Sequence, residues 1–319
     1  MRKRKNRIKL WAILIGFLLL VAMYLYFDRQ SAIAPGILSE SSLKANTLVF
    51  LKESDNSPYL YDFETDQSHR LEFIDKLGGL LFLQPGSEPN QALLLVKAAD
   101  APALYKIDLK QQTSELIGTV DLASPTKAYQ KQNGDYIVVY GNDNRNLALF
   151  DRQLVKISEY EHLARITGVC SIGNDRFVDF ADFDGQKSSI NRLDYSGEEA
   201  KLINDLAKSD QLSGEIYQFD DRVAIYSKKI EDQTSSDENP LGKTYWKITL
   251  FDRDDNTESI ISEGNFDQNA IYDPSLELIA YQKKFDINDQ TDGRVFISSM
   301  GDISDRLEVG RPLLFINLD

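Results

Sequence analysis

One short pattern recurs along the chain and restricts its fold more than any other feature. A segment of alternating apolar residues ends on an acidic residue and is followed by a polar turn and a second short segment. Residues 103–109 are the clearest copy of the first segment and its acidic residue. The six copies end at Asp62, Asp108, Asp151, Asp194, Asp252 and, in the acidic residue's place, Ser299. Consecutive copies are 46, 43, 43, 58 and 47 residues apart. A period in the forties, built from segments with an apolar periodicity of two, is typical of β-propeller blades rather than helical solenoids.

The ends of the repeat region indicate how such a ring closes. Most repeats contain four strand-like segments, but the first has none before Thr47, and an apolar segment at residues 312–318 is left over after the sixth. Placing both in one sheet closes the ring and covers two strand edges. We therefore predict an all-β fold, a six-bladed β-propeller over residues 46–319 closed by the C-terminal strand. Residues 198–208 fit either a strand or a short helix, because their apolar residues also follow helical spacing.

The last repeat resembles a known family. Residues 273–281, followed by residues 293–302, are similar to the repeat of TolB-like six-bladed β-propellers, in which a turn and a strand ending in Ala-Tyr precede a strand of the Ile-Tyr-Val-Met type. The spacing of Tyr272 and Tyr281 recurs in Tyr217 and Tyr226. Glu277 stands where the family has a turn glycine, and the blade tryptophans are absent. The resemblance implies the fold only, because the family fold serves partner binding, sensing and enzyme accessory roles alike.

The first thirty residues differ in composition from the rest. Six basic residues precede residues 10–27, which carry no charge. A helix of that length reaches about 27 Å at ~1.5 Å per residue, close to the ~30 Å hydrocarbon core of a bilayer. We predict a transmembrane signal anchor at residues 10–27, a cytoplasmic basic tail at residues 1–9 and an extracytoplasmic linker at residues 28–45. The alternative is a signal peptide cleaved after Ala34, although Pro35 follows directly.

Charge and cysteine usage restrict the partners and the cell compartment. The formal net charge is -14, and residues 1–30 contribute +6, so the predicted exported part carries -20. Such acidity disfavours nucleic acids and anionic lipids as partners, because both are bound through Lys and Arg. Cys170 is the only cysteine, so an exported domain must be held by a large core rather than by an intrachain disulfide. These features favour a single-pass protein of a bacterial cell envelope with its propeller outside the membrane.

Catalytic and metal-binding patterns are weak. The two histidines, His69 and His162, do not accompany a Gly-x-Ser-x-Gly elbow, and we expect neither a catalytic residue nor a cofactor. The acidic turns at residues 179–185, 252–258 and 286–293 could be calcium loops. In the second, Asp252, Asp254 and Asn256 fit the first three ligand positions, but Thr257 occupies the glycine position, so we predict ordinary hairpin turns and no metal site. The repeated Tyr129, Tyr217 and Tyr272 are predicted to pack between blades.

The insertion at residues 230–243 is the irregular feature of the repeat. It is polar and acidic and leads into two aromatic residues. Because loops on a rigid scaffold commonly carry binding residues, we predict a partner site formed by Glu231, Asp232, Asp237, Glu238, Tyr245 and Trp246. The leading hypothesis is a non-catalytic protein-interaction or sensing module that binds an envelope or membrane protein.

Two alternatives stay open. The first is a cell-surface hydrolase or lyase that acts on a cell-wall or extracellular glycan through carboxylates at the channel mouth. The second is a secreted ligand-binding propeller released by cleavage after Ala34.

Overall fold

The computed structural model describes residues 47–86, 90–170, 176–196, 200–203, 212–232, 243–262, 266–273, 278–283, 293–299 and 302–316. The chain divides into two compact units, residues 1–40 and 41–319, and every described residue lies in the second. The predicted tail, anchor and linker, residues 1–45, therefore lie outside the described residues. Within the described ranges, no helix is long and apolar enough to cross a membrane.

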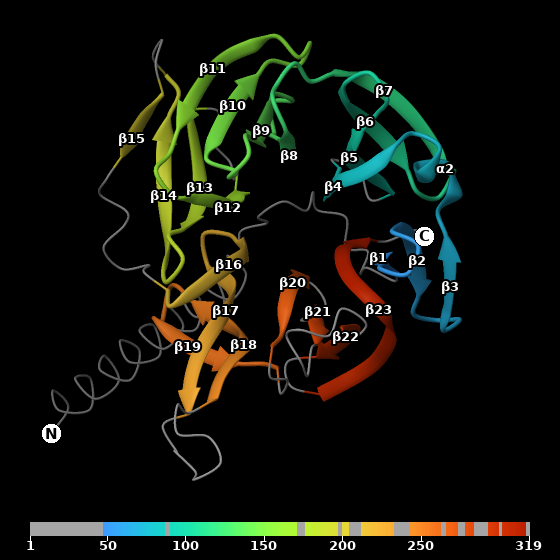
Figure 1. Ribbon diagram of the computed structural model, residues 1–319, viewed down its shortest axis with the longest axis vertical. Helices are drawn as coiled ribbons and strands as arrows, with labels where there is room; N and C mark the ends of the chain where they lie inside the picture. Colours follow the sequence, from blue (N-terminus) through green and yellow to red (C-terminus); the bar gives the residue numbers. More distant parts are fainter. Residues whose placement is uncertain are drawn as a thin grey trace, which may run out of the picture. The chain divides into compact units, whose positions relative to one another are not determined.

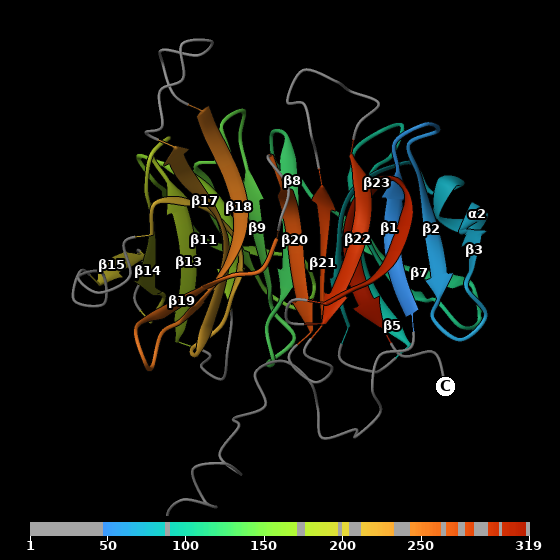
Figure 2. The same ribbon diagram turned by 90° about the horizontal axis from the view of Figure 1, so that it is seen from below.

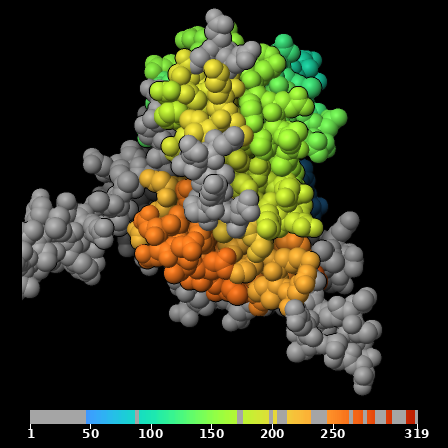
Figure 3. Space-filling view, turned by 90° about the vertical axis from the view of Figure 1, so that its left-hand side faces the viewer, coloured from blue at the N-terminus to red at the C-terminus, as the bar shows by residue number. Residues whose placement is uncertain are grey.

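The described strands form a six-bladed β-propeller, which confirms the predicted fold class (Figure 1). Four blades are separate four-stranded antiparallel sheets, and one seven-stranded sheet holds the sixth and first blades. In blades two to six the first strand lies nearest the centre of the ring and the last at its rim; in blade one the innermost strand is supplied by the C-terminal end of the chain. Figure 3 shows part of the outer surface of blades four and five.

The strands are as follows: in blade one, β1 (Thr47–Lys52), β2 (Ser57–Asp62) and β3 (Gln67–Arg70); in blade two, β4 (Gly79–Pro85), β5 (Gln91–Lys97), β6 (Pro102–Asp108) and β7 (Thr113–Thr119); in blade three, β8 (Pro125–Gln130), β9 (Tyr136–Tyr140), β10 (Asn146–Phe150) and β11 (Lys156–Glu161); in blade four, β12 (Arg165–Cys170), β13 (Phe177–Phe183), β14 (Ser188–Asp194) and β15 (Lys201–Ile203); in blade five, β16 (Gly214–Phe219), β17 (Val223–Asp232), β18 (Lys243–Asp252) and β19 (Thr257–Ile260); and in blade six, β20 (Gln268–Asp273), β21 (Leu278–Lys283) and β22 (Arg294–Ser299), completed by β23 (Asp302–Ile316).

The C-terminal strand closes the ring, as predicted. Residues 302–309 of β23 pair with β22 as the outer strand of blade six, and residues 310–316 pair with β1 as the inner strand of blade one. The segment left over at residues 312–318 is thus not a separate strand: it continues the outer strand of blade six, because β23 changes partner at Gly310, whose N–H donates to the carbonyl of Gly293 at 2.9 Å. Gly310 also lies against the Leu51 carbonyl, where a side chain would not fit.

The recurring acidic residue is a turn-forming residue. The carboxylate of Asp62 accepts hydrogen bonds from the backbone N–H groups of Glu64 and Thr65 at 2.8 and 3.0 Å. Asp252 does the same with the N–H groups of Asp254 and Asp255 at 3.0 and 3.2 Å. Such Asx turns satisfy backbone donors where the chain reverses. In the turn at residues 252–258 the Asp252 carboxylate thus binds the backbone, and the described residues hold no group of three acidic, His or Cys side chains that could bind a metal.

Neighbouring blades are joined by apolar clusters and by side-chain hydrogen bonds. Tyr129 of β8 packs on Phe82 of β4 with ring centroids 5.0 Å apart, as predicted, and Tyr217 and Tyr272 pack on the core shared by blades five and six. The Gln218 amide accepts from the N–H of Tyr272 at 2.8 Å and donates to its carbonyl at 3.0 Å. These contacts hold the inner strands beside one another around the channel.

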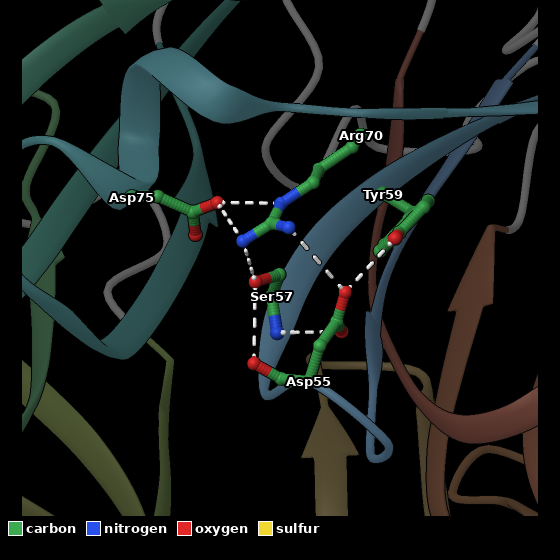
Figure 4. Close-up of polar contacts among 5 residues, drawn as sticks. All are labelled: Asp55, Ser57, Tyr59, Arg70 and Asp75. Carbon is green, nitrogen blue, oxygen red and sulfur yellow. Dashed lines mark hydrogen bonds and ion pairs between the residues drawn. The ribbon is translucent and has the colours of Figure 1, made fainter.

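Two local features complete the description of the strands. β3 ends at Arg70, and a single helical turn, α2 (Glu72–Asp75), follows it where the repeat would continue as strand. Figure 4 shows the reason: Arg70 bonds Asp75 at 2.8 Å and the Ser57 hydroxyl at 2.7 Å, which holds the turn against β2. The ambiguous segment at residues 198–208 contains the strand β15; residues 198–199 and 204–208 lie outside the described residues.

Replacing Gly310 with alanine tests the closure. The added Cβ would overlap the Leu51 carbonyl at the point where β23 changes partner, so we expect Gly310→Ala to lower the free energy of unfolding by about 1–3 kcal/mol. Gly79→Ala is the matched control, because its nearest neighbour would be the Lys97 Cβ at 4.0 Å. Urea unfolding of the two variants measures the difference; equal stabilities would contradict the described register.

Candidate partner-binding site

The predicted binding insertion is carried by the longest hairpin of the propeller as described. β17 and β18 pair over ten positions, from Val223 opposite Asp252 to Asp232 opposite Lys243. Both strands extend further toward the insertion than the sequence indicated. Figure 2 shows this hairpin at the upper face of the ring as drawn there.

The structure places the predicted residues as follows. Glu231 is exposed near the end of β17 and forms an ion pair with Lys229 at 2.7 Å. Asp232 ends the paired part of the hairpin, and Asp237 and Glu238 lie outside the described residues. Tyr245 and Trp246 are residues of β18. They lie opposite Ile230 and Lys229 of β17, respectively. Because side chains alternate along a strand, Tyr245 and Trp246 lie on opposite faces of this sheet.

Trp246 lines a cavity of about 250 Å³ between blade five and its neighbours. The returning segment at residues 266–268 forms one wall, because the N–H of Asp267 donates to the Trp246 carbonyl at 2.9 Å and Phe266 forms a parallel bridge with Trp246. The lining residues are Phe183 of β13, Glu215 and Tyr217 of β16, Ser227 of β17, Trp246 of β18, and Phe266, Asp267 and Gln268.

The cavity combines aromatic walls with a few polar groups. Four of its eight lining residues are aromatic, and two are acidic. Glu215 pairs with Arg165 at 2.9 Å, and the Arg165 guanidinium lies 5.5 Å from the centre of the Phe183 ring. Burial raises the pKa of Tyr217, so its hydroxyl remains protonated at neutral pH. Apolar walls with a small number of directional polar groups are typical of sites that bind a ligand or an inserted side chain.

The cavity lies on the face where the inner strands begin. Glu215 is the second residue of β16, and Gln268 is the first residue of β20. The inner part of β23 starts on this face at Gly310 and ends on the opposite face at Ile316, where it pairs with Thr47. The chain therefore enters the propeller on the face away from the cavity.

Sequence reasoning found Trp246 but missed the rest of the cavity. Phe183, Glu215 and Tyr217 come from strands that look like any other in the repeat, and Phe266–Gln268 belong to a connection without a motif. The insertion beside Trp246 was the available signal. The other members are brought together by the ring geometry.

His162 also takes part in an arrangement that the sequence did not reveal. Its Nε2 donates to the Asp182 carboxylate at 2.6 Å, and the Tyr160 hydroxyl lies 3.2 Å from Nδ1. Asn191 and the Ser189 N–H also bind Asp182, at 2.9 and 3.0 Å. With both ring nitrogens engaged and the pair about 12% exposed, this network joins blades three and four rather than activating a nucleophile.

Removing the buried imidazole tests that interpretation. His162→Ala leaves the buried Asp182 carboxylate with one partner fewer, so we expect the free energy of unfolding to fall by about 1–3 kcal/mol. His69 is exposed on β3, and we expect His69→Ala to change stability by less than about 0.5 kcal/mol. Thermal unfolding compares the two; a His162→Ala variant as stable as His69→Ala would show that the network contributes nothing to the fold.

Comparisons with known proteins agree with the fold. No family model and no curated protein matches the sequence. A chain from the crystal structure of a nidogen/laminin complex is similar over 84% of this chain and 96% of its own, with a TM-score of 0.55 and 8% identity. TolB from Acinetobacter baumannii is similar over 87% of this chain and 67% of its own, with a TM-score of 0.51 and 14% identity. The resemblance to TolB-like propellers is thus confirmed for the fold alone.

Proposed function

We propose that this protein is a non-catalytic interaction module of a bacterial cell envelope. In this proposal, residues 10–27 anchor it in the membrane, the propeller lies on the extracytoplasmic side, and an envelope or membrane protein binds at the Trp246 cavity. The observation that carries the proposal is this aromatic cavity beside the β17–β18 hairpin, on the face opposite the entry of the chain.

The lining of the cavity suits an inserted side chain of a protein partner. Trp, Tyr and Phe supply large apolar contact areas, and residues of this kind dominate the energetics of many interfaces. Glu215 and Asp267 add negative charge, and Glu231 is exposed on the adjoining hairpin. A Lys or Arg anchor, with an apolar stem and a cationic head, fits this combination of rings and carboxylates. The similar chain from the nidogen/laminin structure comes from a protein complex, which agrees with an interaction role.

Site-directed photo-crosslinking in the native membrane tests the proposal. A photo-reactive amino acid at Tyr245 of the full-length chain is expected to capture one reproducible envelope protein, and Trp246→Ala is expected to reduce that capture at least tenfold because it removes the largest ring from the cavity. The same probe at Glu115, exposed on the rim strand β7, is the control position. Equal capture from both positions, or none from Tyr245, would contradict partner binding at this cavity.

One observation favours the glycan-active alternative: Glu215, Asp267 and Trp246 line the same cavity, as carboxylates and a stacking ring would in a glycosidase. The ion pair between Arg165 and Glu215 opposes it, because the Glu215 carboxylate is already bound by a guanidinium rather than directed at a substrate. If the native chain releases sugar fragments from wall polymers and the Glu215→Gln variant does not, the result would support glycan hydrolase or lyase activity. Equal release by the native chain and the variant would exclude Glu215 from such a reaction.

A further inference from the structure

Three basic residues lie near the starts of inner strands, at one end of the propeller ring. Lys127 is the third residue of β8, Arg165 is the first of β12, and Arg311 follows Gly310 on β23. They come from blades three, four and one, whose inner strands lie nearest the centre of the ring in Figure 1. Three basic residues at one end of the ring are notable in a chain with a formal net charge of -14.

The polar contacts leave much of this positive charge without a carboxylate. The Lys127 ammonium donates to the backbone carbonyl of Thr167 on the neighbouring β12. Arg165 pairs with Glu215 at 2.9 Å. The Nε of Arg311 is buried and has no hydrogen-bond acceptor among the described residues. A buried donor of this kind calls for a partner such as a water or an ion.

The electrostatics show that these groups act on one another. Burial, and then the positive charges of Arg165 and Arg311, lower the pKa of Lys127 to about 8, while Glu215 opposes this change. Burial also lowers the pKa of Arg311, and Glu53 opposes it. Blade two separates blades one and three, so Lys127 and Arg311 approach this end of the ring from different sides.

The positive charges of Lys127, Arg165 and Arg311 are not needed to connect neighbouring blades. Gln84 of β4 accepts from the N–H of Gln130 on β8 at 3.0 Å, and Gln218 makes the corresponding contact with Tyr272. Neutral amides thus connect inner strands elsewhere in the same ring. Cations that repel one another in a partly buried position are costly unless an anion offsets them.

We propose that this end of the ring binds a small oxyanion, a carboxylate or a tetrahedral phosphate or sulfate group, between Lys127, Arg165 and Arg311. The anion supplies an acceptor for the Arg311 Nε and offsets the repulsion among the three cations. Charge-assisted bonds to guanidinium and ammonium groups are the contacts that such anions prefer. This proposal does not rest on partner binding at the Trp246 cavity, although Glu215 lines that cavity and also pairs with Arg165.

Thermal unfolding of the full-length chain with sodium sulfate tests the site. Sulfate replaces chloride at constant ionic strength, at pH 7, and binding to the folded state alone raises Tm with a saturating dependence on concentration. We expect Lys127→Met and Arg311→Gln each to reduce the saturating shift at least threefold. Lys201→Met, which removes an exposed lysine on β15, should leave the shift unchanged.

The pH dependence of the native chain gives a second readout that needs no variant. Lys127 is charged below about pH 8 and neutral above it, with Glu215, Arg165 and Arg311 as the charged groups that act on it. Sulfate is fully ionised at both pH 7 and pH 10, so the saturating shift in Tm should be clearly larger at pH 7. Because it uses the native chain, this comparison tests the anion site even if a variant does not fold in chloride alone.

The outcomes separate the alternatives. A parallel titration with sodium acetate distinguishes a site for carboxylates from one for tetrahedral anions. A rise in Tm that is linear in sulfate and equal in all variants and at both pH values would be a general salt effect and would overturn the proposal. A saturating rise that Lys127→Met and Arg311→Gln leave intact would place the anion elsewhere and would overturn it as well.

Discussion

The antiparallel pairing of β1 with the inner part of β23 is the interaction on which the rest of the structure depends. It joins the two ends of the described chain, and the Thr47 hydroxyl also donates to the Ile316 carbonyl at 2.8 Å. Without it, β1 would be an open edge and the first blade would lack its inner strand. Cys170 is the only cysteine, so no intrachain disulfide supports this pairing. The interblade cores, the channel and the Trp246 cavity all require that the ring be closed.

Much of the fold could be predicted from the sequence because its dominant signals are local. The two-residue periodicity located most strands, and the unmatched ends of the repeat predicted the closure. The continuity of β23 could not be predicted, because it depends on the close approach of Gly310 to the Leu51 carbonyl, which only the folded ring creates. The turn α2 was missed for a similar reason: Arg70 and Asp75 are five residues apart, and their contact depends on Ser57 of another strand.

The candidate site was harder to predict than the fold, since its members are far apart in the sequence. Trp246 was found through the neighbouring insertion, whereas Glu215 and Phe266–Gln268 are contributed by other strands and connections. The repeated acidic residues accept hydrogen bonds from backbone N–H groups in the turns that follow them. By contrast Lys127 and Arg311 are inconspicuous in the sequence, and the ring alone makes them neighbours. Glu215 belongs to both regions: it lines the cavity and pairs with Arg165 at the same end of the ring as Lys127 and Arg311.

Hydrogen exchange in the intact chain, followed by mass spectrometry, tests the central claim of a closed ring most directly. If β23 closes the ring, the amides of residues 310–316 and of β1 open only when the whole propeller unfolds. Their exchange should then be as slow as that of the buried central strands β5 and β9. Fast exchange of residues 310–316, with β5 and β9 still protected, would show that the C-terminal strand is a loosely attached edge and would contradict the closed ring.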